Sequence, residues 1–241
     1  MLTATLNAAS VLGRLIACLE SQTDPDFDWV VADGGSTDAT RQLLRNATSL
    51  RVRLFEADDF GIYDALNRGL RQIEDGYYLV MGADDLLEPE SIANFRRAVI
   101  AADHPDFVAA GYRQDGRTRW PRRRLGWLQG VQGIASSHSV GLLIRRDLHA
   151  RYGLYTHRLP IAADQLFIKL ALRGGASIFR AKFIAGTFGT SGTSGSDPLG
   201  VLTEVFRVQV RTERFVSLQY LIFVLRLLKY FVFHQVRRKD G

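Results

Sequence analysis

The pattern of apolar and polar residues changes its period repeatedly along the first half of the chain. Short apolar runs, typical of buried strands, alternate with stretches in which apolar residues recur at helical spacing, as at Leu12, Leu15, Ile16 and Leu19. The pattern predicts strands at 2–6, 29–32, 51–55 and 77–81 and helices at 11–19, 38–45, 63–73 and 88–99. This alternation favours an α/β fold with a mostly parallel sheet that helices cover on both faces.

The second half of the chain has a less regular pattern. It predicts strands at 107–112 and 140–145 and a helix at 164–172, which ends at Gly174 and Gly175. A stretch rich in Gly, Ser and Thr at 186–200 predicts a mobile loop, and a long helical segment follows it. We therefore expect a domain at 1–190, a flexible loop at 191–200 and a helical extension at 201–241.

The composition is that of a folded globular protein. Of the 241 residues, 46% are hydrophobic and 23% are charged, which suits one large α/β domain or one domain with an appendage. Cys18 is the only cysteine, so a disulfide framework and a thiolate metal cluster are both excluded. The first residues lack the basic and apolar regions of a secretory signal, and we expect a cytoplasmic protein.

Positive charge is concentrated in one segment. Residues 113–124 hold six arginines and one aspartate, and they account for +5 of the net charge of +6. Such a segment can contact nucleic acid, an anionic membrane or a phosphorylated substrate, and a solvated loop is an equally good interpretation. Zinc-finger, RNA-binding and recognition-helix patterns do not accompany it, so we expect no nucleic-acid partner.

Two acidic clusters follow predicted strands, where the ligands of open parallel sheets bind. Asp33 ends one strand, and the glycines after it allow a ligand close to the backbone. Asp84 and Asp85 follow another strand; adjacent carboxylates repel each other, and hard oxygen ligands of this kind suit Mg²⁺ or Mn²⁺. An ordinary strand–turn–helix connection remains the alternative for the first cluster, and an exposed polar turn for the second.

The motifs that are absent exclude several classes of enzyme. The sequence has no GxGxxG after the first strand, no GxxxxGK[ST] and no GxSxG, which disfavours dinucleotide oxidoreductases, P-loop NTPases and serine hydrolases. His138 and His157 lack the spacing of an HExxH zinc site. His138 is a candidate metal ligand or phosphate contact, or a histidine of the core.

Five segments, taken in order, resemble glycosyltransferase family 2. They are TATLN at 3–7, VVADGGSTDAT at 30–40, DFGIYDALNRGL at 59–70, LVMGADD at 79–85 and IAADQLFIKL at 161–170. The resemblance covers about residues 2–190 and is greatest to bacterial enzymes of surface-polysaccharide and O-antigen assembly. It implies a GT-A fold, with a Rossmann-like, mostly parallel sheet, and inverting transfer of a sugar from a nucleotide-diphosphate sugar. The nucleotide-binding half would lie at about 1–100 and the acceptor half at 101–190.

The resemblance also implies which residues bind the donor. They are Thr3, Asn7, Asp33, Asp64, Asn67 and Asp84. Asp33 would accept a hydrogen bond from the base, typically uracil, while Asp64 and Asn67 would position the donor and Asp84 would lie near the ribose. UDP-sugar is therefore the expected donor.

Two further roles follow from the same resemblance. Asp85 would bind a divalent cation, Mn²⁺ or Mg²⁺, that bridges the diphosphate, and Asp164 would be the general base. One metal site and one base suffice for single-step inversion, because the cation stabilises the leaving phosphate and the base takes the acceptor's proton. Where relatives often have SHQ, this chain has Ser137, His138 and Ser139, so the role of that glutamine has no match.

The segment at 215–233 is almost long enough to span a bilayer, but it contains Arg226 and Lys229. These cations offset the apolar residues on insertion scales, so a spanning helix is not favoured. Gln219, Arg226 and Lys229 fall on one arc of a helix and leave a broad apolar face. We expect 215–239 to lie on the membrane surface or on a second subunit, with packing against the protein's own core as the alternative.

These observations favour a metal-dependent glycosyltransferase, peripheral on the inner face of the cell membrane, that acts on a saccharide or a lipid-linked acceptor. Two alternatives stay open. A sugar-phosphate nucleotidyltransferase also uses an α/β nucleotide domain and Mg²⁺, but it would begin with a Gly- and Arg-rich loop, whereas the loop here is LNAASVLG. A non-catalytic nucleotide-sugar-binding protein would not require both Asp85 and Asp164.

Overall fold

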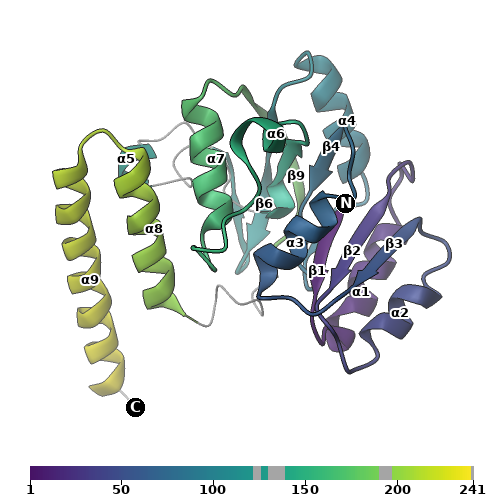
Figure 1. Cartoon of the computed structure of the whole chain (residues 1–241), viewed down its shortest axis with the longest axis horizontal. Helices are drawn as coiled ribbons and strands as arrows, with labels where there is room; N and C mark the ends of the chain where they lie inside the picture. Colours follow the sequence, from purple (N-terminus) through teal and green to yellow (C-terminus); the bar gives the residue numbers. More distant parts are fainter. Residues whose placement is uncertain (122–125, 130–138, 190–196, 240–241) are drawn as a thin grey trace.

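Three parallel strands form the sheet at one end of the molecule (Figure 1). The structure is a computed structural model that describes residues 1–121, 126–129, 139–189 and 197–239. The strands are β1 (Leu2–Thr5), β2 (Trp29–Asp33) and β3 (Val52–Glu56), in the order β1-β2-β3. The helices that connect and cover them are α1 (Ala9–Glu20), α2 (Thr40–Asn46) and α3 (Ile62–Leu70). All five residues of β2 are buried, because it lies between its two neighbours with side chains in both core clusters.

A larger mixed sheet continues from β1. Its strands are β4 (Tyr77–Leu79), β5 (Leu86–Leu87), β6 (Phe107–Gln114), β7 (Arg117–Arg119), β8 (Leu142–Arg145) and β9 (Ile178–Thr187). They run in the order β4-β8-β6-β9-β5, with β7 beside β6, and β6–β9 is the parallel pair among them. A parallel bridge between Leu2 and Val80 joins the two sheets, and the Met81 N–H donates to the Leu2 carbonyl at 2.9 Å.

The other helices lie around the larger sheet and beyond it. They are α4 (Ser91–Ala101), α5 (Gly126–Gln129), α6 (Leu148–Tyr152), α7 (Ala163–Arg173), α8 (Pro198–Thr212) and α9 (Val216–Lys239), and Ser139–Gly141 forms a short 3₁₀ helix. Figure 1 shows α8 and α9 side by side at the end of the molecule opposite to β3. Phe206 of α8 stacks on Phe223 of α9 with ring centroids 4.3 Å apart. The two helices therefore form a hairpin, which we call the C-terminal hairpin.

The α/β fold predicted from the sequence is confirmed, with differences in particular elements. The predicted helix at 88–99 begins at Ser91, because Glu88 and Pro89 bond to other segments: the Glu88 N–H to the Ala185 carbonyl and the Pro89 carbonyl to the Thr23 N–H, both at 2.9 Å. Strand β9 was missed by the sequence pattern. The sheet is parallel in its first part and mixed in its second, so the prediction of a mostly parallel sheet describes β1–β3 best.

The predicted loop at 186–200 is shorter at both ends. Residues 186 and 187 belong to β9, and α8 begins at Pro198. The Asp197 carboxylate accepts the Gly200 N–H at 2.8 Å and caps α8, with Pro198 in the first turn, where its missing N–H costs nothing. The middle of the predicted loop, 190–196, lies outside the described residues.

The arginine-rich segment is partly described. Arg117 and Arg119 are exposed on β7, which forms a hairpin with β6. Arg113 forms an ion pair with Glu88. The remaining arginines, 122–124, lie outside the described residues.

The single cysteine, Cys18, forms hydrogen bonds between a helix and a strand. The Cys18 thiol of α1 donates to the Leu87 carbonyl of β5 at 3.2 Å, and the Leu87 N–H donates to Cys18 Sγ at 3.0 Å. Burial raises the pKa of the Cys18 thiol. The side chain thus joins α1 to the larger sheet as a neutral thiol.

Candidate functional site

The acidic clusters lie where β2, β1 and β4 end, at the carboxyl edge of neighbouring parallel segments. Asp33 is the last residue of β2, and β1 beside it ends at Thr5. The Leu2–Val80 bridge places the β4 segment, which leads to Asp84 and Asp85, on the other side of β1. Because ligands of open α/β sheets bind at this edge, the fold places both clusters where a nucleotide would bind.

Asp33 fixes the turn that follows β2. Its side chain is 0% exposed and accepts four hydrogen bonds from Thr5 Oγ1 (3.0 Å), Ser36 Oγ (2.5 Å), the Ser36 N–H (2.8 Å) and the Gly35 N–H (3.1 Å). Gly35 has a φ of 87°, a conformation that costs glycine little. The Asp33 carboxylate therefore determines the shape of this turn from inside the protein.

The loops after β1 and β2 are joined by Asn7. Its side-chain oxygen accepts the Thr37 N–H at 2.9 Å, and its own N–H donates to Ser36 Oγ at 2.8 Å. Asn7 itself is exposed. It thus lies at the surface of the site, beside the turn that Asp33 fixes.

Thr3 and Thr5 differ in their contacts. Thr3 is 0% exposed, and its hydroxyl accepts the indole N–H of Trp29 at 2.9 Å. Thr5, which sequence reasoning passed over, is the threonine that contacts Asp33. Because side chains alternate along a strand, both threonines lie on the same face of β1. They differ in that Thr5, and not Thr3, contacts Asp33.

Asp59 and Arg68 also contact the Asp33 turn. A methyl group on Gly34 would come within 2.2 Å of Asp59 Oδ2, so the aspartate lies directly against the turn. Arg68 of α3 donates to the Asp33 carbonyl at 2.9 Å and lies 3.9 Å from Asp59. Both residues belong to the segment DFGIYDALNRGL, but the sequence pattern gave no reason to choose them, because their partner is a turn far away in the chain.

Helix α3 carries two further candidates. Asp64 lies in its first turn and is partly exposed, with the Phe60 N–H at 3.4 Å from its carboxylate. Asn67 is 1% exposed; its amide N–H donates to the Tyr155 carbonyl at 2.8 Å, and its oxygen accepts the Tyr155 N–H at 2.9 Å. Asn67 therefore fixes the backbone at Tyr155, and Asp64 is the more exposed of these two candidates.

We expect Asn67→Ala to lower the free energy of unfolding by about 2–4 kcal/mol, because it leaves two buried backbone groups of Tyr155 without partners. Urea denaturation followed by fluorescence measures this change. Asn46→Ala, at the exposed end of α2, is the matched control and should change stability by less than about 0.5 kcal/mol. Equal stabilities of the two variants would contradict the role assigned to the Asn67 amide.

Asp85 is a buried carboxylate between two backbone segments. It is 0% exposed and accepts the Gly82 N–H (2.6 Å), the Gly189 N–H (2.8 Å) and the Ser139 hydroxyl (3.3 Å). Burial and, to a smaller extent, the charge of Asp84 raise the pKa of Asp85 to about 6, against the effect of these hydrogen bonds. Ser139 is the position at which this chain departs from the SHQ pattern, and its neighbour His138 lies outside the described residues.

The Asp84–Asp85 pair fits a divalent cation that takes its other ligands from phosphate and water. Within the described residues, no group of three or more His, Cys, Asp or Glu side chains forms a closed protein cage for a metal. The Asp84 carboxylate is partly exposed and lies against Gly189, where a methyl group would come within 2.2 Å of it. A pair of adjacent carboxylates with one member buried and the other near solvent is the arrangement in which Mg²⁺ or Mn²⁺ contacts one or two carboxylates and a substrate diphosphate.

Asp164 lies in the first turn of α7. Its Oδ1 accepts the Tyr63 hydroxyl at 2.8 Å and the Gln165 N–H at 2.8 Å. Burial raises the pKa of Asp164, and the two hydrogen bonds oppose this rise. A half-buried carboxylate with a raised pKa in the first turn of a helix is a candidate general base.

Helix α3 brings these groups into one region. From its first turn Tyr63 reaches Asp164 of α7, and from its last turn Arg68 reaches the Asp33 turn. The structure thus joins Asp33, Asp64, Asn67 and Asp164 through a single helix, while Asp84 and Asp85 follow the neighbouring strand. Tyr63 was not selected from the sequence, because an internal tyrosine of a helix has no pattern that separates it from a core residue.

Comparison with known protein sequences gives consistent matches. Residues 2–155 match the family model described as Glycosyl transferase family 2. A PGL/p-HBAD biosynthesis glycosyltransferase of Mycobacterium tuberculosis (strain ATCC 25177 / H37Ra) is 32% identical over 167 residues. That alignment covers 66% of this chain and 64% of the relative, so the chain matches slightly less than two thirds of the length of this curated relative.

Solved structures share the fold. S. aureus TarS 1–349 in complex with UDP-GlcNAc has a TM-score of 0.69 at 19% identity, over 96% of this chain and 72% of that one. The mannosyltransferase PcManGT from Pyrobaculum calidifontis in complex with GDP-Man and Mn²⁺ has a TM-score of 0.65 at 17% identity, over 88% and 64% of the two chains. At these low sequence identities, the similarity to both structures concerns the fold alone.

Proposed function

Because the chain belongs to glycosyl transferase family 2 and has the GT-A fold of these enzymes, we propose that it transfers a sugar from a nucleotide-diphosphate sugar to an acceptor hydroxyl, with inversion. The observation that carries this proposal is that two carboxylates with raised pKa values, the buried Asp85 and the half-buried Asp164, lie in different surroundings. One lies beside a second carboxylate and suits a cation, and the other lies at the start of a helix and suits a base.

A UDP-sugar is the donor that we propose. One structural neighbour contains UDP-GlcNAc, and another contains GDP-Man with Mn²⁺, which supports a nucleotide-diphosphate sugar without selecting the base. Asn7, Asp64 and Asp84 have exposed surface and would contact the donor directly. Thr3, Asp33 and Asn67 are buried and bonded within the protein, so they would act by holding the backbone around the donor.

Asp85, with Asp84, would hold a divalent cation, Mn²⁺ or Mg²⁺. When bound, such a cation stabilises the negative charge that develops on the leaving diphosphate. The Gly82 and Gly189 N–H groups would keep the Asp85 side chain in one orientation during this step.

Asp164 would accept the proton of the acceptor hydroxyl. The acceptor oxygen forms its bond to the anomeric carbon as the bond from that carbon to the β-phosphate oxygen breaks, and the nucleoside diphosphate leaves. The proton passes to the Asp164 carboxylate, which the Tyr63 hydroxyl and the Gln165 N–H orient. A single displacement of this kind needs one base and no enzyme nucleophile.

Product analysis tests the reaction class. The full chain with Mn²⁺ is incubated with UDP-, GDP- and dTDP-sugars and saccharide or lipid-linked acceptors, and products are identified by mass spectrometry. We expect one glycosylated acceptor with inverted anomeric configuration, together with free nucleoside diphosphate. Formation of a nucleotide sugar from sugar phosphate and nucleoside triphosphate would identify a nucleotidyltransferase instead, and tight donor binding without any transfer would identify a binding protein.

We further propose that the C-terminal hairpin binds an anionic lipid surface through α9, which supports a lipid-linked acceptor. The outward residues of α9 form a long apolar face, with side chains between 39% and 59% exposed: Val216, Tyr220, Leu221, Val224, Leu225, Leu228, Phe231 and Val232. Among the helices that the structure describes, none is both long enough and apolar enough to cross a bilayer. An apolar face on such a helix suits a position in the plane of a membrane surface.

The charges of α9 favour lipid over a second copy of the chain. Residues 214–239 contain six Lys and Arg residues and no Asp or Glu. Arg226, near the middle, turns inward and donates to Gln209 of α8 at 3.1 Å, which leaves the apolar face free of its charge. A second copy of α9 would bring no acidic residue to pair with these cations, whereas anionic headgroups would neutralise them.

We expect a triple variant, Leu221→Ser, Leu225→Ser and Leu228→Ser, to bind phosphatidylglycerol vesicles about 100-fold more weakly, because about 1 kcal/mol of apolar burial is lost at each position. Vesicle sedimentation measures the binding. Ile100→Ser with Leu170→Ser, which removes exposed apolar side chains elsewhere, is the control and should bind like the wild type. Unchanged binding by the triple variant would refute the lipid surface, and a change from dimer to monomer in light scattering would assign α9 to a subunit interface.

A further inference from the structure

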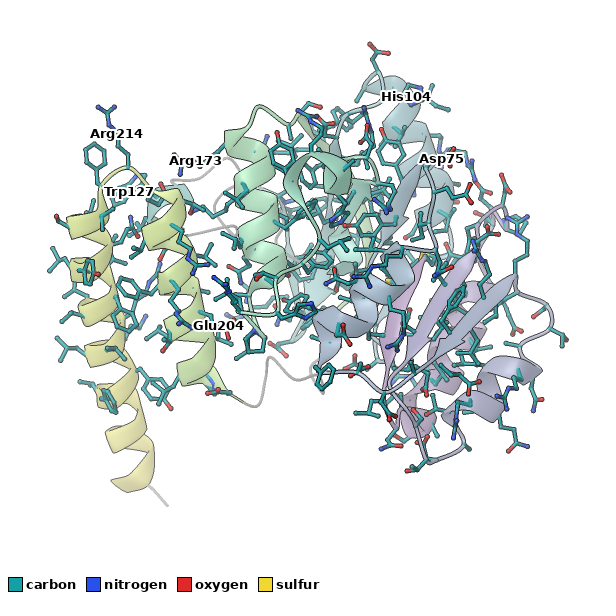
Figure 2. All side chains as sticks on the ribbon, viewed as in Figure 1. Asp75, His104, Trp127, Arg173, Glu204 and Arg214 are labelled. Carbon is teal, nitrogen blue, oxygen red and sulfur yellow. The ribbon has the colours of Figure 1, made fainter. Side chains whose placement is uncertain are left out.

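Helix α8 reaches the segment that carries Asp164 through one buried carboxylate. Glu204 is 7% exposed, and its Oε2 accepts the Ile161 N–H at 2.9 Å and the Ala162 N–H at 2.8 Å. Figure 2 shows Glu204 on the side of α8 that faces α7. These two N–H groups lie just before Ala163, the first residue of α7, where a helix start leaves N–H groups without partners inside the helix.

The same short segment is held from the opposite side by α3. The Tyr63 hydroxyl donates to the Ile161 carbonyl at 2.9 Å as well as to Asp164 at 2.8 Å. Residues 161–164 are therefore fixed between Tyr63, which contacts a carbonyl and the carboxylate, and Glu204, which contacts two N–H groups. Removal of either side chain leaves buried backbone groups without partners, and the Asp164 backbone loses one of its two supports.

The packing around Glu204 keeps α8 close to this segment. A methyl group on Gly200, one turn before Glu204, would come within 2.8 Å of Ile161 Cδ1. At the other end of α8, Lys169 of α7 forms a buried ion pair with Glu213, and Arg173, labelled in Figure 2, donates to the Thr212 carbonyl at 2.5 Å. Helix α8 is thus attached at Glu204 to the residues just before α7 and at its C-terminal end to α7 itself, and the Glu204 contact is the one next to Asp164.

We propose that Glu204 is a positioning residue for Asp164, so that α8 is part of the catalytic unit as well as of the membrane-binding hairpin. This proposal rests on the role of Asp164 as the base. A carboxylate oxygen that accepts two successive N–H groups fixes the backbone direction at Ile161 and Ala162, and this direction sets where the Asp164 side chain points.

Several titratable groups face Asp164. Their effects on its pKa make the pH profile a readout that distinguishes a positioning role of Glu204 from a general contribution to stability. The groups are Tyr63 of α3, Tyr78 of β4, Tyr155 in the segment before α7, and Glu204 of α8. The negative charge of Glu204 raises the pKa of Asp164, whereas the Tyr63 hydrogen bond lowers it. Glu204→Gln keeps an oxygen acceptor for both N–H groups but removes the charge.

The experiment compares three variants of the full chain with the donor and acceptor that the product analysis identifies. Glu204→Ala removes the acceptor of both N–H groups. We expect kcat to fall about 10–100-fold with little change in the KM for the donor, because the base is then misplaced. Glu204→Gln should keep kcat within about 3-fold of the wild type and move the acid limb of the kcat/KM profile to lower pH. Glu74→Gln, which removes a carboxylate at an exposed position outside residues 161–164, is the matched control, with near-wild-type kcat and an unmoved acid limb.

Two results would overturn the proposal: a kcat for Glu204→Ala as high as that of Glu74→Gln, or an acid limb that Glu204→Gln leaves in place. If Glu204→Ala fails to fold, the pH profile of kcat/KM for Glu204→Gln still tests the proposal. Failure of the proposed function is recognised separately, because Asp164→Asn would then turn over like the wild type or the wild type would transfer no sugar. An inactive Asp164→Asn beside a normal Glu204→Ala would refute only the role of Glu204.

Discussion

Asp164→Asn lowers kcat by roughly 10²–10⁴-fold, the usual contribution of a positioned general base, while the protein folds and binds its donor as the wild type does. The amide can still accept the Tyr63 hydroxyl and the Gln165 N–H, so the local structure persists. It cannot take up the acceptor's proton. Steady-state kinetics, thermal unfolding and calorimetric titration with UDP measure the three quantities.

The pH profile gives a second measurement of the same role. Because burial raises the pKa of Asp164, the wild-type acid limb should lie above the ordinary range of an aspartate, and activity should fall as pH decreases through it. Asp164→Asn should lose that limb from its residual activity. Near-normal turnover in Asp164→Asn would leave the side chain as a structural element of the first turn of α7, since Asn serves helix starts about as well as Asp.

Removal of the divalent cation is the second large effect that we expect. EDTA should lower transfer at least about 100-fold, because a cation at the diphosphate supplies several kcal/mol of charge stabilisation. Asp85→Asn should lose the gain in UDP affinity that Mn²⁺ produces, although the amide oxygen can still accept N–H donors from Gly82 and Gly189. Titration of UDP with and without Mn²⁺ measures this coupling.

Asp75→Asn is the matched control for Asp85→Asn. Asp75 is exposed and lies far from the C-terminal hairpin (Figure 2), and it does not belong to the acidic pair. It should keep the full effect of Mn²⁺ on UDP affinity. An Asp85→Asn variant that binds UDP with Mn²⁺ as tightly as Asp75→Asn would remove Asp85 from the cation site.

The elements that the sequence predicted best are those with a strong local pattern. The run WVVA forms β2, buried on both faces, and the stripe from Leu12 to Leu19 forms α1. Strand β9 has exposed or partly exposed residues at most of its positions, and Arg180 and Lys182 interrupt its apolar residues, so its sequence has no clear strand pattern. The helical pattern continues past Thr212 without Gly or Pro, and the break arises because the backbone of Glu213 is extended, with a ψ of 149°.

The contacts that organise the site could not be derived from the sequence, because they join segments far apart in the chain. Tyr63 and Asn67 of α3 contact Asp164 and Tyr155, and Glu204 of α8 contacts Ile161 in the segment before α7. Motif positions predicted the carboxylates themselves. They did not predict which of the predicted residues are buried, and so did not separate Asn7 and Asp64, which have exposed surface, from Thr3 and Asn67, which do not.

The bonded thiol of Cys18 makes this chain suitable for site-specific labelling without removal of a native cysteine. Thiol reagents react with exposed thiolates, and Cys18 is held as a neutral thiol between α1 and β5 by the Leu87 backbone. A cysteine introduced at Leu225 on α9 would therefore react first with a maleimide fluorophore. Quenchers placed at known depths in a bilayer would then report how far that position enters the lipid, residue by residue along the helix.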